Sequence, residues 1–281
     1  MAEAAAARAG LDTGMFSVHQ MHPEAALRLG GSTALGGLAE RGRSLQSLVT
    51  EHGTGLVILS AEVDYRDELT FFTAPFVRTE ATVGLRDDGR LVEFRMRHLA
   101  GAAAAEAIDI RVTARPIALS GGPALDATAT AVPPAVRALF GPEELLPRAG
   151  LPTRRLAAEV DRRTAGAEPL GGGQRPFFVG RSDCELADQW LYARLPSLVG
   201  AAREQLLLDG VAGLADTGRR PLVRFAAEYR RPMYFGDRGT VEVAAWRAGG
   251  QTVVVHRVHG AGVPGADPAD RPLCALALEV F

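Results

Sequence analysis

The sequence contains no lysine and no asparagine, so arginine supplies all 31 of its basic side chains. Without lysine the chain cannot form a Schiff base with a carbonyl substrate. Without asparagine no side chain of that type can donate hydrogen bonds to an oxyanion. The two cysteines, Cys184 and Cys274, are too few for a metal cluster. Disulfide use is not expected in a reducing compartment, and we expect no metal site.

The chain also has little net charge and no long apolar run. Its 281 residues carry a formal net charge of −2, with 47% hydrophobic and 23% charged residues. Nucleic acids and anionic membranes both require a basic surface, so we expect neither as a partner. No apolar run approaches the roughly 18 residues of a membrane span. Residues 1–15 lack a hydrophobic signal core and are expected to form a disordered leader of a cytoplasmic protein.

The sequence repeats itself once. Two of the repeated stretches share an offset of 161 residues, and the middle one is shifted to 164. A repeat of this length that occurs twice predicts two copies of one small domain, because a solenoid needs about three short repeats or more. The matching stretches are residues 16–18 with 177–179, residues 63–71 with 227–235, and residues 89–101 with 250–262.

Hydrophobic periodicity predicts the same elements in each half. A long helix from Pro23 to about Thr50 opens the first half, and a helix over about 186–208 opens the second. Strands are expected at 56–65, 76–85, 90–98 and 108–117, and again at 222–229, 239–247, 251–259 and 273–281.

The region between the halves is rich in proline, glycine and alanine. Residues 119–175 are expected to be a linker, with short helical pieces at 136–140 and 143–146 and a flexible glycine run at 171–173. The sequence therefore predicts an α+β protein with domains at 16–118 and 176–281.

A helix followed by a curved antiparallel sheet, in two joined copies, resembles the double hot-dog architecture. Residues 181–192 are similar to the helix-start motif of thioesterases of the 4-hydroxybenzoyl-CoA type. Asp183 and Glu185 match its acidic positions, whereas Gln189 stands where the motif has histidine. Leu191 and Tyr192 replace its asparagines. Residues 229–237 resemble the Y-x-x-P-x-x-x-G-D strand of the same superfamily.

Over its whole length the chain distantly resembles the bifunctional acyltransferase/decarboxylases of leinamycin-type polyketide biosynthesis. The stretches that carry this resemblance are 31–34, 40–43 and 185–192. The resemblance implies acyl transfer from CoA to an acyl carrier protein through an acylated tyrosine, in bacterial secondary metabolism. Tyr65 is the only tyrosine of the first half and is the candidate in this chain.

Positions that differ between the halves are the stronger site candidates. His22 corresponds to Asp183, and both are expected near a helix start, where backbone N–H groups can hold an oxygen. His22 can act as a general base, and Asp183 or Glu185 can orient water. The alternatives are an exposed turn histidine and a helix-capping aspartate. The expected substrate-binding residues are Gly30, Gly31, Ser32, Gln189 and Tyr192.

Positions that repeat in both halves favour structural roles. Tyr65 recurs as Tyr229, and His98 recurs as His259. We expect packed tyrosines and strand-end histidines there, with catalysis by Tyr65 as the less favoured alternative. Cys184 is a poor nucleophile because adjacent carboxylates raise the pKa of a thiol.

The sequence therefore predicts an enzyme that acts on an acyl thioester. Acyl-CoA and an acyl carrier protein are its expected partners, with no permanently bound cofactor, in a monomer or a homodimer. Acyl transfer, with or without decarboxylation, is the leading hypothesis. The alternatives are a thioesterase, a dehydratase or isomerase with His22 as base, and a non-catalytic acyl-binding module.

Overall fold

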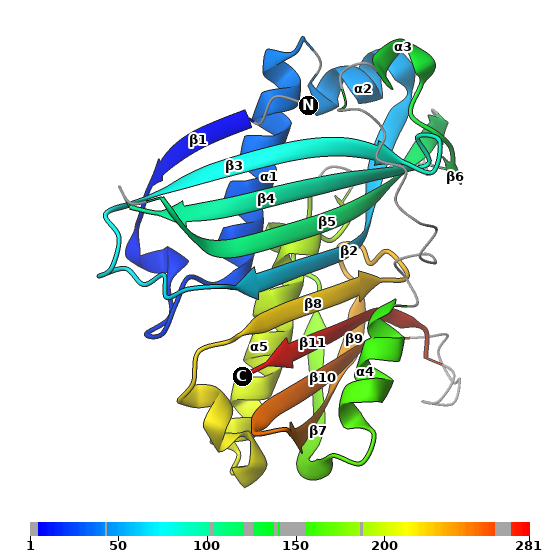
Figure 1. The fold of residues 1–281 in the computed structure, drawn as a ribbon. Helices are drawn as coiled ribbons and strands as arrows, with labels where there is room; N and C mark the ends of the chain where they lie inside the picture. The colour runs from blue at the N-terminus through cyan, green and yellow to red at the C-terminus, as the bar shows by residue number, and fades with distance from the viewer. Residues whose placement is uncertain are drawn as a thin grey trace. The chain divides into compact units, whose positions relative to one another are not determined.

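The computed structural model describes residues 5–42, 44–101, 104–120, 126–137, 140, 155–185, 188–261 and 271–281. Contacts within the chain divide it into two units, Met1–Gly150 and Leu151–Phe281. Each unit contains a long helix packed on an antiparallel sheet, which can be followed in Figure 1. All eight predicted strands are present, and their ends lie within three residues of the expected positions.

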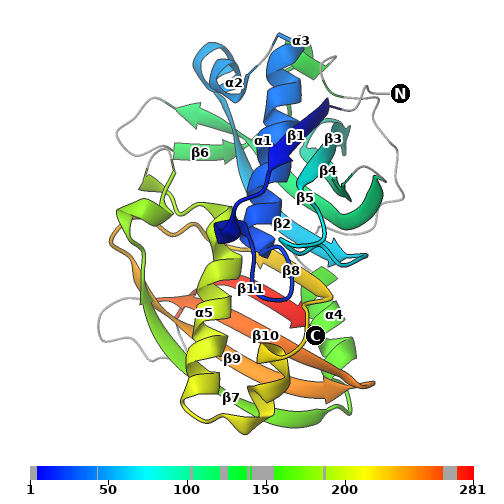
Figure 2. The same cartoon turned by 90° about the vertical axis from the view of Figure 1, so that its left-hand side faces the viewer.

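The strands of unit 1 are β1 (Ala5–Gly10), β2 (Thr54–Tyr65), β3 (Phe76–Arg86), β4 (Leu91–Ala100), β5 (Ala105–Ser120) and β6 (Asp126–Ala129). They follow the order β1-β3-β4-β5-β2, and β6 pairs with β5 outside this order. Neighbouring strands are antiparallel. Helix α1 (Pro23–Glu40) packs on this sheet, as Figure 2 shows.

The helix predicted over Pro23–Thr50 is two helices. Helix α1 ends at Glu40, and α2 (Leu45–His52) begins after Ser44, whose hydroxyl accepts a hydrogen bond from the N–H of Ser47 at 3.1 Å. Gly42 lies between them with φ +85°, a conformation that a helix cannot contain. A short helix, α3 (Pro134–Arg137), follows later in the unit and overlaps one of the expected helical pieces. The other, at 143–146, lies outside the described residues.

The strands of unit 2 are β7 (Glu168–Phe178), β8 (Arg224–Tyr229), β9 (Arg238–Ala248), β10 (Gln251–Gly260) and β11 (Leu273–Val280). They follow the order β8-β11-β10-β9-β7, again antiparallel. Helix α5 (Leu195–Leu208) packs on one face, while α4 (Arg155–Thr164) packs on the other. The helix predicted over 186–208 begins later than expected because Pro196 is tolerated only in a first turn.

Helix α4 covers an apolar face of the unit 2 sheet. Leu156 and Val160 form one cluster with buried residues of three strands: Ala226, Val253, Val255, Leu276, Leu278 and Val280. The carboxylate of Glu228, which is 1% exposed, accepts a hydrogen bond from the Leu156 N–H at 2.7 Å. Burial raises the pKa of Glu228, although this bond and Arg230 act in the opposite direction. Glu228 therefore satisfies an N–H that the helix start would otherwise leave unpaired.

Several segments expected to lack regular structure contain strands and helices. Strand β1 lies within the expected leader, where it pairs with β3. The expected linker contains β6, α4 and most of β7. The glycine run 171–173 is part of β7, where Gly172 stands against the backbone of β9. A Cβ at Gly172 would lie 2.1 Å from the carbonyl oxygen of Val243, so close approach, not flexibility, requires this glycine.

The repeated tyrosines have equivalent places in the two units. The hydroxyl of Tyr65 donates to the carbonyl of Met21 at 2.7 Å, and that of Tyr229 donates to the carbonyl of Tyr192 at 2.8 Å. In each unit the accepting carbonyl lies just before the long helix. Each unit also has an edge-to-face aromatic pair, Phe16 with Phe71 and Phe178 with Phe235, so the counterpart of Phe16 in this contact is Phe178, one residue after the Phe177 of the sequence match.

The matched histidines lie on opposite faces of their sheets. His98 is completely buried, with Nε2 2.9 Å from the Ala26 carbonyl of α1 and Nδ1 2.9 Å from the Thr79 hydroxyl. His259 is partly exposed and lies 3.7 Å from Glu242. A shift of one residue turns a strand side chain to the other face. The repeat offset of 161 therefore aligns β4 with β10 one residue away from their structural alignment. The two histidines are not structural equivalents.

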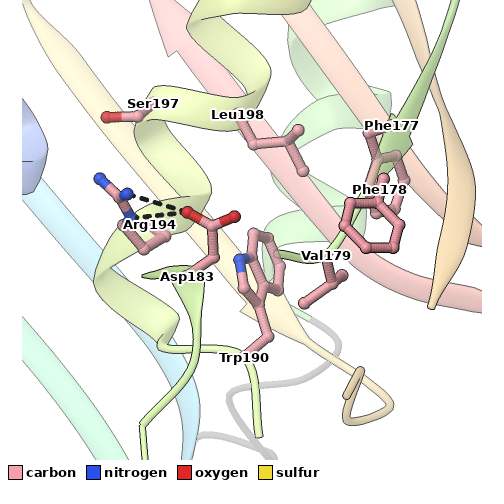
Figure 3. Close-up of a pocket in the computed structure, with 8 residues that line it drawn as sticks. All are labelled: Phe177, Phe178, Val179, Asp183, Trp190, Arg194, Ser197 and Leu198. Carbon is pink, nitrogen blue, oxygen red and sulfur yellow. Dashed lines mark hydrogen bonds and ion pairs between the residues drawn. The ribbon is translucent and has the colours of Figure 1, made fainter. Parts of the chain in front are cut away.

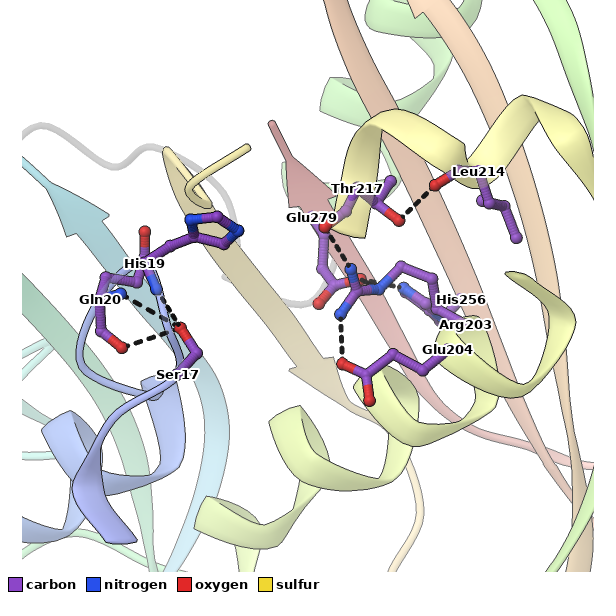
Figure 4. Close-up of polar contacts among 9 residues, drawn as sticks. All are labelled: Ser17, His19, Gln20, Arg203, Glu204, Leu214, Thr217, His256 and Glu279. Atoms are coloured by element: carbon purple, nitrogen blue, oxygen red, sulfur yellow. Dashed lines mark hydrogen bonds and ion pairs between the residues drawn. The ribbon is translucent and has the colours of Figure 1, made fainter. Parts of the chain in front are cut away.

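Unit 2 has an ion cluster between α5 and its sheet, shown in Figure 4. Arg203 of α5 and His256 of β10 lie 3.1 and 2.9 Å from the same oxygen of Glu279 of β11, and all three are buried. Burial alone would raise the pKa of Glu279, but Arg203 and His256 outweigh it, and the pKa lies below its usual value. Arg203 also lies over the ring of Phe281, at 4.8 Å. The cluster holds α5 to the sheet at a fixed position, because parting it would leave buried charges unpaired.

Two glycine substitutions in unit 2 should change its stability in opposite directions. Gly172→Ala forces a Cβ into the backbone of β9 and should lower the free energy of unfolding by about 1–3 kcal/mol. Gly200→Ala is the matched control, because its Cβ would meet only Arg203, at 3.7 Å, and should stabilise α5 by up to about 1 kcal/mol. Both tryptophans, Trp190 and Trp246, lie in unit 2, so fluorescence in urea reports its unfolding. Equal stability of the two variants would contradict the packing described for β7.

The buried His98 should make stability fall in acid. A carbonyl only accepts, so Nε2 carries the proton and Nδ1 accepts from Thr79. Burial lowers the pKa of His98 from 6.5 to about 4, although its bond to Ala26 acts in the opposite direction. The unfolded chain thus binds a proton first, and stability is lost as pH falls from 6.5 towards about 4. Between about pH 7.5 and about pH 5 the loss should be roughly 2 kcal/mol.

His98→Gln tests this assignment, because an amide can make the same two hydrogen bonds without titrating. Urea unfolding followed by circular dichroism at both pH values measures the loss in each protein. The variant should lack the roughly 2 kcal/mol component that the wild type shows. Identical losses would show that His98 is not the responsible group.

Candidate functional site

A pocket of about 190 Å³ lies in unit 2, where the end of β7 faces the start of α5. Figure 3 shows its lining: Phe177, Phe178, Val179, Asp183, Trp190, Arg194, Ser197 and Leu198. The aromatic and aliphatic side chains form one wall, and the polar ones gather at the start of the helix. Small-molecule sites commonly measure about 300–1,000 Å³, so this pocket is small.

An ion pair stands at the polar end of the pocket. Nη2 and Nε of Arg194 lie 2.8 and 3.1 Å from Oδ1 of Asp183. Oδ2 of Asp183 accepts a hydrogen bond from the N–H of Gly180 at 3.2 Å. A carboxylate offers about four lone-pair positions, so these three bonds leave Oδ2 able to accept one more. The carboxylate is thus fixed in direction and can still bind a water or a substrate proton.

The helix start supplies a further electrostatic contribution. Asp183 belongs to a 3₁₀ turn, η3 (Arg181–Asp183), and Arg194 ends a second one, η5 (Tyr192–Arg194), directly before α5. Ser197 and Leu198 stand in the first turn of α5 and line the pocket. The N-terminal end of a helix carries a partial positive charge, which favours an oxygen that gains negative charge there.

Aromatic side chains remain exposed at the rim of the pocket. Phe178 and Phe235 are 54% and 43% exposed, although their rings contact each other. The guanidinium of Arg181 lies over the ring of Phe235, at 4.3 Å from its centre, and forms an ion pair with Asp188.

The predicted residues of unit 2 separate into two groups. Asp183 lines the pocket, whereas Glu185, Gln189 and Tyr192 are not among its lining residues. Glu185 is exposed, and partial desolvation raises its pKa. Gln189 forms an isolated bridge with Tyr234. The ring of Tyr192 stacks edge to face on Tyr229 at 6.2 Å.

The adjacent Cys184 has the environment expected of a poor nucleophile. Desolvation, followed by the carboxylates of Asp188 and Asp183, raises the pKa of its thiol. Its Sγ lies 3.4 Å from the carbonyl oxygen of Gly180. The thiolate is therefore disfavoured, as the sequence predicted.

The predicted residues of unit 1 lie apart along α1. His22 is exposed at the N-cap of α1, and its side chain makes no capping bond. Gly30, Gly31 and Ser32, which were expected to bind substrate, lie about two turns inside α1. Gly30 is buried, and a Cβ there would meet the sulfur of Met96 at 2.8 Å. Gly30 thus allows the helix to approach the sheet, which is a packing role.

Tyr65 has a structural partner in this arrangement. Its hydroxyl is bonded to the Met21 carbonyl, which fixes the loop before α1. The equivalent Tyr229 has a pKa raised well above 10 because of burial and, secondarily, Tyr192. The hydroxyl of Tyr229 is therefore neutral and serves as a hydrogen-bond donor.

Of the eight residues that line the pocket, sequence reasoning identified only Asp183; the missed residues that carry polar groups are Trp190, Arg194 and Ser197. The loop before α5 positions the first of them, because the Trp190 N–H bonds to the carbonyl of Met233 and the Leu191 N–H to that of Asp183. Pro196 was the available signal, since it marks a helix start and so places Arg194 next to the N-terminus.

Among the described residues, no group of three or more His, Cys, Asp or Glu side chains is arranged to hold a metal ion. The same part of the chain has no helix that is both long and apolar enough to span a membrane.

Three solved structures resemble nearly the whole chain. One is of a protein assigned as an oleoyl thioesterase from Lactobacillus plantarum (TM-score 0.72, 12% identity, 99% of this chain and 96% of that one). The others are a 12:0-ACP thioesterase from Umbellularia californica (0.66, 10%, 98% and 96%) and an acyl-ACP thioesterase from Bacteroides thetaiotaomicron (0.62, 10%, 99% and 97%). No family model matches the sequence, and no curated protein sequence matches it.

These likenesses establish the fold. The chain has the α+β double hot-dog architecture that the sequence predicted.

Tyr65→Phe should separate a structural tyrosine from a catalytic one. Loss of one hydroxyl bond should lower the free energy of unfolding by about 1 kcal/mol, and any turnover of an acyl thioester that the wild type shows should stay within about threefold. Tyr229→Phe is the matched variant and should behave in the same way. Stability is measured by urea unfolding and turnover by thiol release. A large loss of turnover in Tyr65→Phe alone, at unchanged stability, would show that Tyr65 is catalytic.

Proposed function

We propose that the chain hydrolyses an acyl thioester of CoA or of a phosphopantetheinyl carrier protein. The observation that carries the proposal is the pocket of unit 2, where an apolar wall leads to the Asp183–Arg194 ion pair and the start of α5. An acyl thioester has the same two parts, an apolar chain and a polar carbonyl. The three full-length structural neighbours support this choice, because each bears the name of a thioesterase.

The proposed reaction uses Asp183 to orient water. The oxygen of the water bonds to the thioester carbonyl carbon while one of its protons moves to the carboxylate of Asp183. Arg194 and the positive end of α5 stabilise the negative charge that develops on the carbonyl oxygen. The C–S bond then breaks, and the thiolate takes up the proton that Asp183 had accepted, which restores the carboxylate. A thiol has a pKa near 8.5, so the leaving group requires little help from an acid.

Acyl transfer is the second candidate. The residue that replaces the motif histidine, Gln189, has no basic group, and the resemblance to leinamycin-type acyltransferase/decarboxylases implies transfer to a carrier. Intact-protein mass spectrometry distinguishes the two reactions. The full chain is mixed with holo carrier protein and a panel of acyl-CoA esters that includes methylmalonyl-CoA. Free acid and free thiol indicate hydrolysis, and acyl mass on the carrier indicates transfer. No change with any ester, nor with preloaded carriers, would contradict both.

Asp183→Asn tests the proposed role of the carboxylate. The amide keeps the shape but cannot accept a proton, so kcat should fall about 10²–10⁴-fold. Asp188→Asn is the matched control on the same loop, because Asp188 is ion-paired with Arg181 and does not line the pocket. Its φ of +56° is one that asparagine tolerates, and its turnover should stay within about twofold.

Thermal unfolding of both variants shows whether the fold is retained. Full activity in Asp183→Asn would assign Asp183 to holding the loop through Gly180 and Arg194 and would remove it from the reaction.

A further inference from the structure

The stretch 229–237 ends in a tight turn, which no step of the proposed reaction uses. The N–H of Asp237 donates to the carbonyl of Tyr234 at 3.0 Å, and the N–H of Tyr234 donates to Oδ2 of Asp237 at 2.8 Å. Gly236, the third residue of this turn, has φ +91°, a conformation that favours glycine. The glycine and the aspartate of the stretch therefore build one turn, which a backbone bond and a side-chain bond close together.

The backbone of this turn is bonded to two segments that line the pocket. The N–H of Val179 donates to the carbonyl of Asp237 at 2.8 Å, and the N–H of Gly236 donates to the carbonyl of Val179 at 3.0 Å. The carbonyl of Met233, at the start of the turn, accepts from the N–H of Trp190 at 2.8 Å. Val179 and Trp190 both line the pocket, as Figure 3 shows. The turn therefore holds the end of β7 and the loop before α5 in one arrangement.

The turn depends on its hydrogen bonds more than on burial. Met233 is 3% exposed, but Tyr234 and Phe235 are 47% and 43% exposed. The N–H of Phe235 donates to the carbonyl of Asp188 at 2.8 Å, and Gln189 forms its bridge with Tyr234. A charge-assisted bond such as the one from Tyr234 to the Asp237 carboxylate is stronger than a bond between neutral groups. Loss of this carboxylate should therefore loosen the turn without opening the core.

The carboxylate of Asp183 is held independently of the turn. Its two oxygens bond to Arg194 and to the N–H of Gly180. A looser turn should therefore disturb the apolar wall of the pocket, where Val179 and Trp190 lie, more than it disturbs Asp183.

We propose that Asp237 is a positioning residue of the pocket, which acts through the turn to hold Trp190 and Val179 in place. This inference rests on the proposed function, since it assigns a further residue to the same site. The wall contacts an acyl group equally before and during the reaction, so its disturbance weakens binding and leaves the chemical step unchanged.

The first measurement is the kinetics of Asp237→Ala, by thiol release from an acyl-CoA ester that the wild type hydrolyses. KM should rise about tenfold, and kcat should stay within about threefold. Thermal unfolding shows that the variant is folded. A role confined to stability would lower the unfolding temperature and leave KM unchanged.

The second measurement requires no turnover. The substitution Trp246→Phe leaves Trp190 as the only tryptophan, and its fluorescence is quenched with acrylamide in native buffer. Quenching should be stronger when Asp237→Ala is added, because the loop that carries Trp190 then moves more freely. A role confined to stability would leave the quenching of the folded protein unchanged.

Two variants serve as controls. Asp237→Asn keeps an oxygen that can accept from the Tyr234 N–H, so its KM should stay within about threefold of the wild type. Asp209→Ala removes an aspartate that pairs with Arg175 at the other end of α5, and it should match the wild type in KM and in quenching.

Gly236→Ala replaces Asp237→Ala if the latter does not fold. A Cβ at Gly236 would meet nothing within 4 Å, so this substitution strains the turn through its φ alone and keeps the carboxylate. It should shift KM and quenching in the same direction.

Unchanged quenching or unchanged KM in the folded variant would overturn the proposal. It would also be overturned if Asp237→Asn were as impaired as Asp237→Ala, because the bond to Tyr234 would then not be the cause. The two proposals fail separately. Stronger quenching in a protein whose wild type turns over no thioester would keep the positioning role and reject hydrolysis. Turnover with unchanged KM and quenching in the variant would keep hydrolysis and reject the positioning role.

Discussion

One hydrogen bond, made twice, fixes where each long helix begins. A tyrosine near the end of a strand donates its hydroxyl to a carbonyl just before the helix, from Tyr65 to Met21 in unit 1 and from Tyr229 to Tyr192 in unit 2. A buried tyrosine hydroxyl must find such a partner, and the carbonyl is constrained in return. The bond therefore ties the loop before the helix to the sheet. In unit 2 this loop carries Asp183, Trp190 and Arg194, so the geometry of the pocket depends on it.

The two units treat polar groups in their interiors differently. Unit 1 buries a neutral histidine, His98, with both ring nitrogens satisfied, and lets α1 approach the sheet through Gly30 against Met96. Unit 2 buries an arginine, a glutamate and a histidine together between α5 and the sheet. The first arrangement requires close packing, and the second requires that each charge keep its partner. The second unit is thus the one in which the helix position is set electrostatically, and it is also the unit with the described pocket.

The strands and the duplication could be read from the sequence, because alternating apolar residues and turn signals are local properties. The equivalence of Tyr65 and Tyr229 was also readable, since tyrosine is scarce in this chain. The non-equivalence of His98 and His259 could not be read from the sequence. An alignment error of one residue places a side chain on the other face of the sheet, and matching residue types alone do not reveal such an error. The start of α5 was placed too early, as the loop before it is held by distant contacts such as that of Trp190 with Met233.

The candidate site was predicted only in part, because local sequence patterns reveal some of its residues and distant contacts position the others. Asp183 was found because it precedes a helix and matches an acidic motif position. Arg194 was marked only indirectly, by Pro196 at the helix start, since it acts through an ion pair across a loop with Asp183. Such roles follow from tertiary structure, and a single sequence does not encode them in any recognisable pattern.

Helix α4 has a consequence for how the chain can be divided. It comes before every strand of unit 2, yet it covers the apolar face of that sheet, and its first turn occupies the buried carboxylate of Glu228. A fragment that started at β7 would present Val253, Val255 and Leu278 to water and would leave a buried acid without its donor. A fragment limited to the second sequence repeat, which begins at residue 177, is therefore not expected to fold independently. The smallest fragment suited to separate expression has to begin ahead of Arg155.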